Sequence, residues 1–427
     1  MAWLAYTIIT LGSSTLWGVA SGWLLYFYLP PGAPPLEPLA FYSIVILVSK
    51  GVNILLGLPI GYISDHTRSS WGRRLPYVIG GATLIPILFV LLWTPPHNST
   101  PGLTSVYLFL VLIGFNAVYE IHQVPYEALL PELAVGEKDR VAISTWKTGF
   151  LLGGNILAGF TGPLISKFGY FHSMLIFAVI VAPILILPGF FLRKKIDSGY
   201  QPVRQISFLT SLKITFSNRA FQIFAITWGL MWTAATLVLE TLPFVVTEVC
   251  HLKESDTVYF YLPAIAITLI AFPFITKMAE RYGMKAVFRG SLLAGAISLP
   301  GLMLIGEQIP IPLIAQGIIW VVLQSASLAG AQILPGAMIA AITDLDESQT
   351  GQRREGSFYS VWGLLNQVSS GLGLAIIPLF LILGRSRSDP HGPLGVRLLG
   401  LAGGLLLLAA FWVFRNYKVE DHKIRYV

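Results

Sequence analysis

Long uninterrupted apolar runs are the feature of this chain that most restricts its fold. In the 427-residue sequence 55% of the residues are hydrophobic and only 11% are charged, whereas about 25% are charged in soluble domains. A helix needs roughly 20 apolar residues to cross a bilayer, and in lipid only helices and closed barrels satisfy all their backbone polar groups. Because these runs do not alternate with polar residues, they predict membrane-spanning helices and exclude a barrel.

Twelve such runs are present, and we expect each to span the membrane. Connectors rich in proline and glycine, such as residues 30–35 and 95–102, separate several of them. The expected spans lie near residues 6–29, 38–63, 75–94, 103–124, 141–165, 171–192, 219–247, 257–278, 286–306, 311–342, 357–383 and 396–414.

Lysine and arginine residues are unevenly distributed between the connectors. Most of the 28 lie in connectors that follow even-numbered spans, and the other connectors hold only Lys167, Lys253, Arg385, Arg387 and Arg397. The positive-inside rule then places both termini in the cytoplasm, in a plasma (inner) membrane. The net charge of +7 is explained by this inner face next to anionic lipid, so we expect contact with membrane lipids and no nucleic-acid partner.

The longest basic connector, residues 193–218, is expected to be a cytoplasmic central loop. It separates an N-terminal six-helix bundle over residues 1–192 from a C-terminal six-helix bundle over residues 219–427. The loop after the second span of each half carries an acid, an arginine, a glycine and a further base, in residues 65–74 and again in residues 280–285. Two related halves of six spans are typical of secondary transporters that bind their solute near the membrane midplane.

Four stretches resemble the major facilitator superfamily, and in particular its glycoside–pentoside–hexuronide:cation symporter family. They are residues 61–76, residues 124–133, Asp139-Arg140 with Lys147 and Gly149, and residues 350–356. The resemblance implies the major facilitator fold, which is an all-α integral membrane protein with twelve transmembrane helices in two pseudo-symmetric bundles. It also implies a secondary transporter that moves a sugar, glycoside or related small polar solute by alternating access, together with H⁺ or Na⁺. We expect a monomer with no cofactor and no bound metal.

Ionisable residues inside the expected spans are candidate functional residues, because a buried charge is costly in a membrane. Glu120, Gln123 and Glu127 share one helix face, and Pro125 should bend that helix. Lys50 and Lys147 could pair with either acid or meet the oxygens of a solute. The alternative for Glu127 is a solvated position at the cytoplasmic mouth. No nucleophile triad, metal-ligand spacing or phosphate loop is present in the sequence, so we do not expect an enzyme.

The positions where the resemblance places charged coupling residues are neutral in this chain. The acidic cation-site positions of the family fall on Asn53, Gly57 and Gln123, and a lysine position in span 11 falls on Gln367. Because sodium prefers anionic oxygen ligands, a sodium site is in doubt, and proton coupling could pass to Glu120, Glu127 or Glu240 instead. Uncoupled uniport, and transport of a lysolipid or similar amphiphile, remain the alternatives.

The predicted substrate-binding set combines these polar residues with two aromatic ones that could stack on a sugar. The alternative for the aromatic residues is packing or anchoring at the membrane interface. The set is Lys50, Asn53, Tyr119, Glu120, Gln123, Glu127, Lys147, Trp232, Glu240 and Gln367.

Charged residues near the cytoplasmic helix ends predict a gate. An acid within a basic loop, such as Asp65, needs a partner, and ion pairs that form in only one state can bias a conformational change. The alternative is ordinary surface charge, which contributes little. The predicted gating residues are Asp65, Arg73, Arg74, Glu280, Arg281 and Arg354.

Overall fold

The computed structural model describes residues 2–31, 36, 38–96, 101–133, 137–193, 213, 215–351, 355–384 and 392–417. All regular elements within these ranges are helices, and ten are long and apolar enough to cross a membrane. The two remaining expected spans correspond to α3 (Leu75–Leu91), which has 17 residues, and α6 (Glu137–Gly159), which begins with charged residues. The prediction of an all-helical, multi-pass membrane protein is confirmed.

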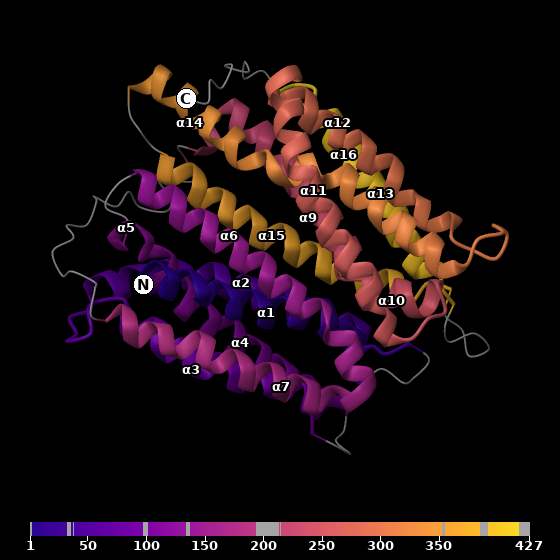
Figure 1. The fold of residues 1–427 in the computed structure, drawn as a ribbon, viewed down its shortest axis with the longest axis horizontal. Coiled ribbons are helices and arrows are strands. Elements are labelled where there is room, and N and C mark those ends of the chain that lie inside the picture. Colours follow the sequence, from indigo (N-terminus) through magenta and orange to yellow (C-terminus); the bar gives the residue numbers. More distant parts are fainter. Residues whose placement is uncertain are drawn as a thin grey trace. The chain divides into compact units, whose positions relative to one another are not determined.

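The chain divides into two compact units (Figure 1). Unit 1 comprises Met1–Gln205 with Lys253–Val258, and unit 2 comprises Ile206–Leu252 with Tyr259–Val427. Most of the predicted central loop 193–218 lies outside the described residues, so its bounds stay a prediction. The six residues from Lys253 were expected in the C-terminal half, but they pack with unit 1 although the chain on both sides of them belongs to unit 2.

In unit 1 the long helices lie side by side (Figure 1). Besides α3 and α6 they are α1 (Ala2–Tyr28), α2 (Leu39–His66), α4 (Pro101–Ala128) and α7 (Thr161–Leu192), and α5 (Leu130–Leu133) is a short turn after α4. α1 packs on α6 and α7, and α4 packs on α2 and α3. Small residues allow the close approach: a β-carbon on Gly154 of α6 would lie 2.0 Å from Oγ of Ser14 on α1.

Residues 141–165 and 171–192 were expected as two spans, and the backbone bends between them at Gly169, with an additional interruption at Phe160. α6 ends at Gly159, and α7 continues from Thr161 to Leu192 with one non-helical residue, Gly169, at φ 74° and ψ 173°. This backbone conformation is one that side chains with a β-carbon rarely adopt, and it makes the sharp bend possible.

Unit 2 holds two interrupted helices where single spans were expected. α9 (Arg219–Leu239) is followed by α10 (Leu242–Phe244) and the π-helical η1 (Val245–Val249), and α13 (Leu313–Ile333) is followed by α14 (Pro335–Thr350). Pro243 and Pro335 lie in the first residues of the following helices. Proline has no backbone N–H to donate, so it is tolerated at a helix start and breaks a helix interior.

Unit 2 also contains four further long helices. They are α11 (Val258–Tyr282), α12 (Met284–Ser298) with the 3-10 turn η3 (Leu299–Leu304), α15 (Glu355–Leu381) and α16 (Leu394–Phe414). α9 packs on α15 and α16, and α12 packs on α13 and α16. Another 3-10 turn, η2 (Glu254–Thr257), belongs to the segment that packs with unit 1, where it lies on α7.

Candidate functional site

The polar stripe on α4 is one turn longer than the sequence prediction. Asn116 lies four residues before Glu120, so it shares the face of Glu120, Gln123 and Glu127. Asn116 and Glu120 are buried, with 3% and 7% of their surfaces exposed, whereas the Glu127 side chain is 45% exposed. The helix continues through Pro125 to Ala128. The stripe therefore runs from a buried region of unit 1 to an accessible one.

Two buried amides connect this stripe to α2. Nδ2 of Asn53 donates a hydrogen bond of 3.2 Å to Oδ1 of Asn116, and Asn53 is only 2% exposed. Oδ1 of Asn53 has no hydrogen-bond partner among the described residues. A buried acceptor without a partner is costly, so this oxygen is available to a ligand.

Lys50 lies one turn before Asn53, against an aromatic pair. Its Nζ is 4.4 Å from the centroid of the Trp17 ring, close enough for a cation–π interaction. The Trp17 and Tyr119 rings are 4.8 Å apart and tilted by 41°. Lys50, like Glu120, is 7% exposed. The structure thus places predicted residues of α2 and α4 near a ring of α1.

The predicted pairing of Lys147 with Glu127 is present. Nζ of Lys147 on α6 forms an ion pair with Oε2 of Glu127, and it lies 5.4 Å from the centroid of the Tyr126 ring. The other carboxylate oxygen accepts a hydrogen bond of 2.8 Å from Nε2 of Gln123. Oε1 of Gln123 has no partner in the described part of the chain. A polar chain therefore links α6 to the α4 stripe.

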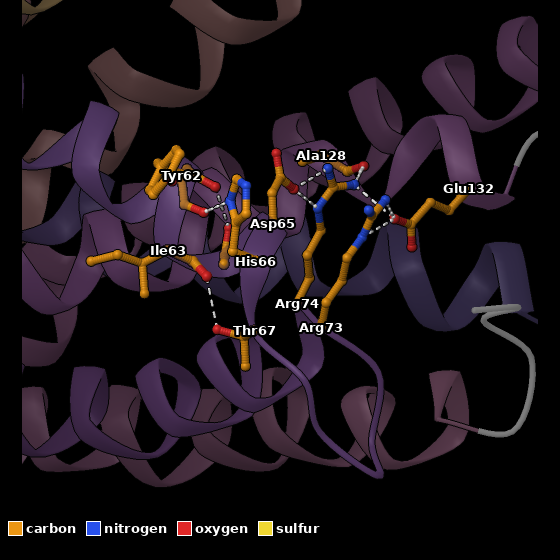
Figure 2. A network of polar contacts seen from close by, with 11 residues as sticks. Tyr62, Ile63, Asp65, His66, Thr67, Arg73, Arg74, Ala128 and Glu132 are labelled. Carbon is orange, nitrogen blue, oxygen red and sulfur yellow. Dashed lines mark hydrogen bonds and ion pairs between the residues drawn. The ribbon is translucent and has the colours of Figure 1, made fainter. Parts of the chain in front are cut away.

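Arg74 joins two acids at one end of unit 1 (Figure 2). Its Nε and Nη2 donate to Oδ1 of Asp65 at 2.9 and 2.5 Å, and its Nη1 donates to Oε1 of Glu132 at 2.9 Å and to the backbone oxygen of Ala128. Nη2 of Arg73 lies 2.6 Å from the same Glu132 oxygen. The network holds together the end of α2, the start of α3 and the α4–α5 turn.

The remaining predicted gating residues belong to unit 2 or lie outside the described residues. Glu280 and Arg281 are exposed at the end of α11 in unit 2, and the Arg281 guanidinium lies 5.3 Å from the Tyr282 ring. Arg354 lies outside the described residues. The ion pairs described for Asp65, Arg73 and Arg74 are all internal to unit 1.

Three predicted substrate-binding residues belong to unit 2. Trp232 stacks on Trp228 with ring centroids 5.3 Å apart. Glu240 caps the C-terminus of α9, at the interruption before α10. Gln367 lies on α15, next to Asn366, whose Oδ1 accepts a hydrogen bond of 2.5 Å from Nε1 of Trp228.

A cavity in unit 2 is lined by none of the predicted site residues. It has a volume of about 590 Å³ and is lined by α12, η3 and α13 and the residues that follow η3. Its lining is largely apolar, and several lining residues, such as Ile297 and Leu304, are exposed on the helix surface. This groove has the character of a lipid-facing surface, and none of the predicted site residues line it.

The chain is similar to a known family of transport proteins over almost its whole length. A family model described as "MFS/sugar transport protein" matches residues 5–421. The chain belongs to this family. The predicted membership of the major facilitator superfamily, and of its glycoside–pentoside–hexuronide:cation symporter branch, is thereby confirmed. The chain is accordingly a multi-pass membrane transporter of a small molecule and not an enzyme.

Relatives and solved structures are similar to most of the chain. An uncharacterised symporter of Synechocystis sp. is 26% identical over 439 residues, covering 81% of this chain and 79% of that protein. The isoprimeverose transporter of Lactiplantibacillus pentosus is 25% identical over 397 residues, with 89% and 79% covered. A crystal structure of a mutant nucleoside transporter NupG has a TM-score of 0.71 at 15% identity, covering 98% of this chain and 100% of that one. The major facilitator fold is confirmed by this likeness.

Sequence reasoning missed several residues of the site in this MFS transporter. Asn116 could have been found from its spacing to Glu120. Glu132 was noticed within a family motif, but its role as the acid shared by Arg73 and Arg74 was not predicted. Asn366 had no signal, because its hydrogen bond to Trp228 depends on the packing of α15 on α9.

Proposed function

We propose that this transporter moves a neutral sugar or glycoside by alternating access, in symport with a proton. The observation that carries the proposal is that unit 1 holds two buried residues of opposite charge inside its membrane-spanning part, Lys50 on α2 and Glu120 on α4, each 7% exposed. While Glu120 is ionised the two charges cancel, so the site offers no excess charge to an ionic solute, which favours a neutral one.

The groups around these charges suit a sugar. Asn53 offers a buried amide oxygen without a partner among the described residues, and such an oxygen can accept a hydrogen bond from a sugar hydroxyl. Trp17 and Tyr119 supply aromatic surface next to Lys50, on which the apolar face of a sugar ring can pack. The isoprimeverose transporter among the relatives supports the same solute class.

Glu120 is our candidate for the proton-coupling group. The family's acidic positions are neutral here, at Asn53, Gly57 and Gln123, and neutral oxygens alone are poor ligands for sodium. Glu127 is less suited because it is 45% exposed and already paired with Lys147. Glu240 lies in unit 2 at the end of α9 and stays a second candidate.

For the gate, we propose that Arg74 holds the cytoplasmic ends of α2, α3 and the α4–α5 turn as one block. The ion pairs described for Asp65, Arg73 and Arg74 lie inside unit 1, which supports a role in keeping this block rigid while the transporter changes state. A gating role for Glu280, Arg281 and Arg354 stays a prediction.

The distribution of basic residues supports a plasma (inner) membrane location with both termini in the cytoplasm. We propose that the transporter acts as a monomer surrounded by membrane lipids and has no nucleic-acid partner.

Uptake by purified protein in liposomes tests this function. We expect the liposomes to accumulate a labelled pyranoside, with isoprimeverose as the first probe, when the outside is more acidic than the lumen, so that protons are driven inward. Glu120→Gln should lose accumulation and keep exchange of labelled for unlabelled sugar. Proton coupling would be refuted if a sodium gradient alone drove accumulation. It would also be refuted if the sugar only equilibrated across the membrane under every gradient. Transport of lysophosphatidylcholine with no sugar movement would refute the sugar reading and favour an amphiphile.

A further inference from the structure

Three tryptophans of unit 2 pack together on α9 and α15. Trp228 and Trp232 lie in the middle third of α9, and Trp362 lies within α15, one turn before Asn366. Membrane tryptophans usually anchor helices at the interface, where the ring sits at the level of the headgroups. Trp228 and Trp232, in the middle of a spanning helix and with Trp228 bonded to the Asn366 amide, do not fit that role. Polar groups inside spanning helices are functional candidates.

Trp228 is the fixed centre of this group. It is 3% exposed, and its Nε1 donates a hydrogen bond to Oδ1 of Asn366. The Trp232 ring stacks on it at 5.3 Å with an interplanar angle of 16°. The Trp362 ring meets it edge-on at 5.4 Å and 66°. Both outer rings are therefore held by contact with one buried, hydrogen-bonded indole.

The rings of Trp232 and Trp362 still have surface and a donor group with which a ligand could interact. Trp232 and Trp362 are only partly buried, so part of each indole is accessible. Nε1 of Trp362 has no hydrogen-bond partner among the described residues, although that atom is shielded from solvent. An indole N–H that is buried usually has an acceptor, and here the packed chain supplies none.

We propose that Trp232 and Trp362 form a stacking subsite in unit 2 for a pyranose ring of the transported glycoside. The apolar C–H face of the ring packs on Trp232, and a ring hydroxyl oxygen accepts a hydrogen bond from Nε1 of Trp362. Trp228 and Asn366 position the two indoles. The proposal rests on the proposed sugar transport and assigns a sugar-binding subsite to unit 2.

Equilibrium binding of labelled isoprimeverose and raffinose to the purified full chain tests this subsite. Trp362→Phe removes the N–H donor and keeps an aromatic ring, and we expect its Kd to rise about 3- to 10-fold, the loss of one hydrogen bond. Trp232→Leu removes the stacking surface, with a rise of about tenfold or more, and Trp232→Phe should give a smaller rise. The matched control is Trp412→Leu, because Trp412 on α16 is 57% exposed; it should bind as the parent does.

The outcomes separate this proposal from the proposed function. If the parent transports a pyranoside but Trp362→Phe and Trp232→Phe both bind it within twofold of the parent, the subsite is refuted and sugar transport stands. If the parent neither binds nor transports isoprimeverose, raffinose or another pyranoside, the proposed function is refuted as well. The phenylalanine variants decide the question even if Trp232→Leu does not fold, as judged by its melting temperature and size-exclusion profile.

Discussion

Gly162 on α7 leaves the space that the backbone oxygen of Glu254 occupies. A β-carbon at residue 162 would lie 2.1 Å from this oxygen and 2.1 Å from Oγ1 of Thr257. The Tyr170 hydroxyl on the same helix donates a 3.4 Å hydrogen bond to Oε1 of Glu254. Glycine at this position therefore allows the segment Lys253–Val258 to dock on unit 1, although its chain neighbours belong to unit 2.

We predict that Gly162→Ala displaces this segment. A methyl group cannot fit against backbone atoms at such distances, so Ser255→Cys in the Gly162→Ala background should react faster with a water-soluble maleimide. Gly102→Ala is the matched control, because Gly102 is also the second residue of a helix and a β-carbon there meets nothing within 4 Å. Equal labelling rates in the two backgrounds would contradict the prediction.

The Arg74 network predicts a strong effect of neutralising Glu132. The Glu132 side chain is 3% exposed and Arg74 is 8% exposed, and removal of one partner from a buried ion pair costs about 3 kcal/mol. Glu132→Gln should therefore lower the melting temperature clearly. Glu347→Gln, at an exposed position of α14, should leave it nearly unchanged. A Glu132→Gln variant as stable as the parent would mean that the network does not hold the α4–α5 turn.

The Lys147–Glu127 pair should matter for transport more than for stability. Its side chains are 21% and 45% exposed, and partly exposed pairs contribute about 1 kcal/mol or less. We expect Lys147→Glu and Glu127→Lys each to reduce uptake about tenfold or more, with little change in melting temperature. The double variant restores the pair in reverse and should recover part of the uptake. No recovery in the double variant would show that the two residues act independently.

Two neighbouring glycines of α3 should respond in opposite ways to alanine. A β-carbon on Gly81 would lie 2.6 Å from Cβ of His122 on α4, whereas one on Gly80 would meet nothing within 4 Å. Gly81→Ala must push α3 and α4 apart and loosen the 2.8 Å hydrogen bond between Nδ1 of His122 and the backbone oxygen of Val78, which should lower the melting temperature. Gly80→Ala should be neutral or stabilising by up to about 1 kcal/mol, because alanine favours helix. A similar response in both variants would contradict this packing.

Long apolar runs were enough to predict a multi-pass helical protein, because the bilayer requires each backbone polar group to be satisfied within its own segment. The positions of helix interruptions were harder to predict. Pro243 and Pro335 are visible in the sequence, but whether a proline breaks a helix or is accommodated within it, as Pro125 is in α4, depends on the neighbouring helices.

The candidate site divides in the same way. The sequence by itself determined which ionisable residues lie inside the spans, and helical periodicity placed Glu120, Gln123 and Glu127 on one face. Only the tertiary structure decided which polar residues of the site pair with one another. Glu127 pairs with Lys147, Asn53 with Asn116, and Arg74 with both Asp65 and Glu132. Periodicity acts within one helix, whereas each of these contacts joins two elements. Their choice of partner depends on how the helices pack, and helix spacing in the sequence does not contain that information.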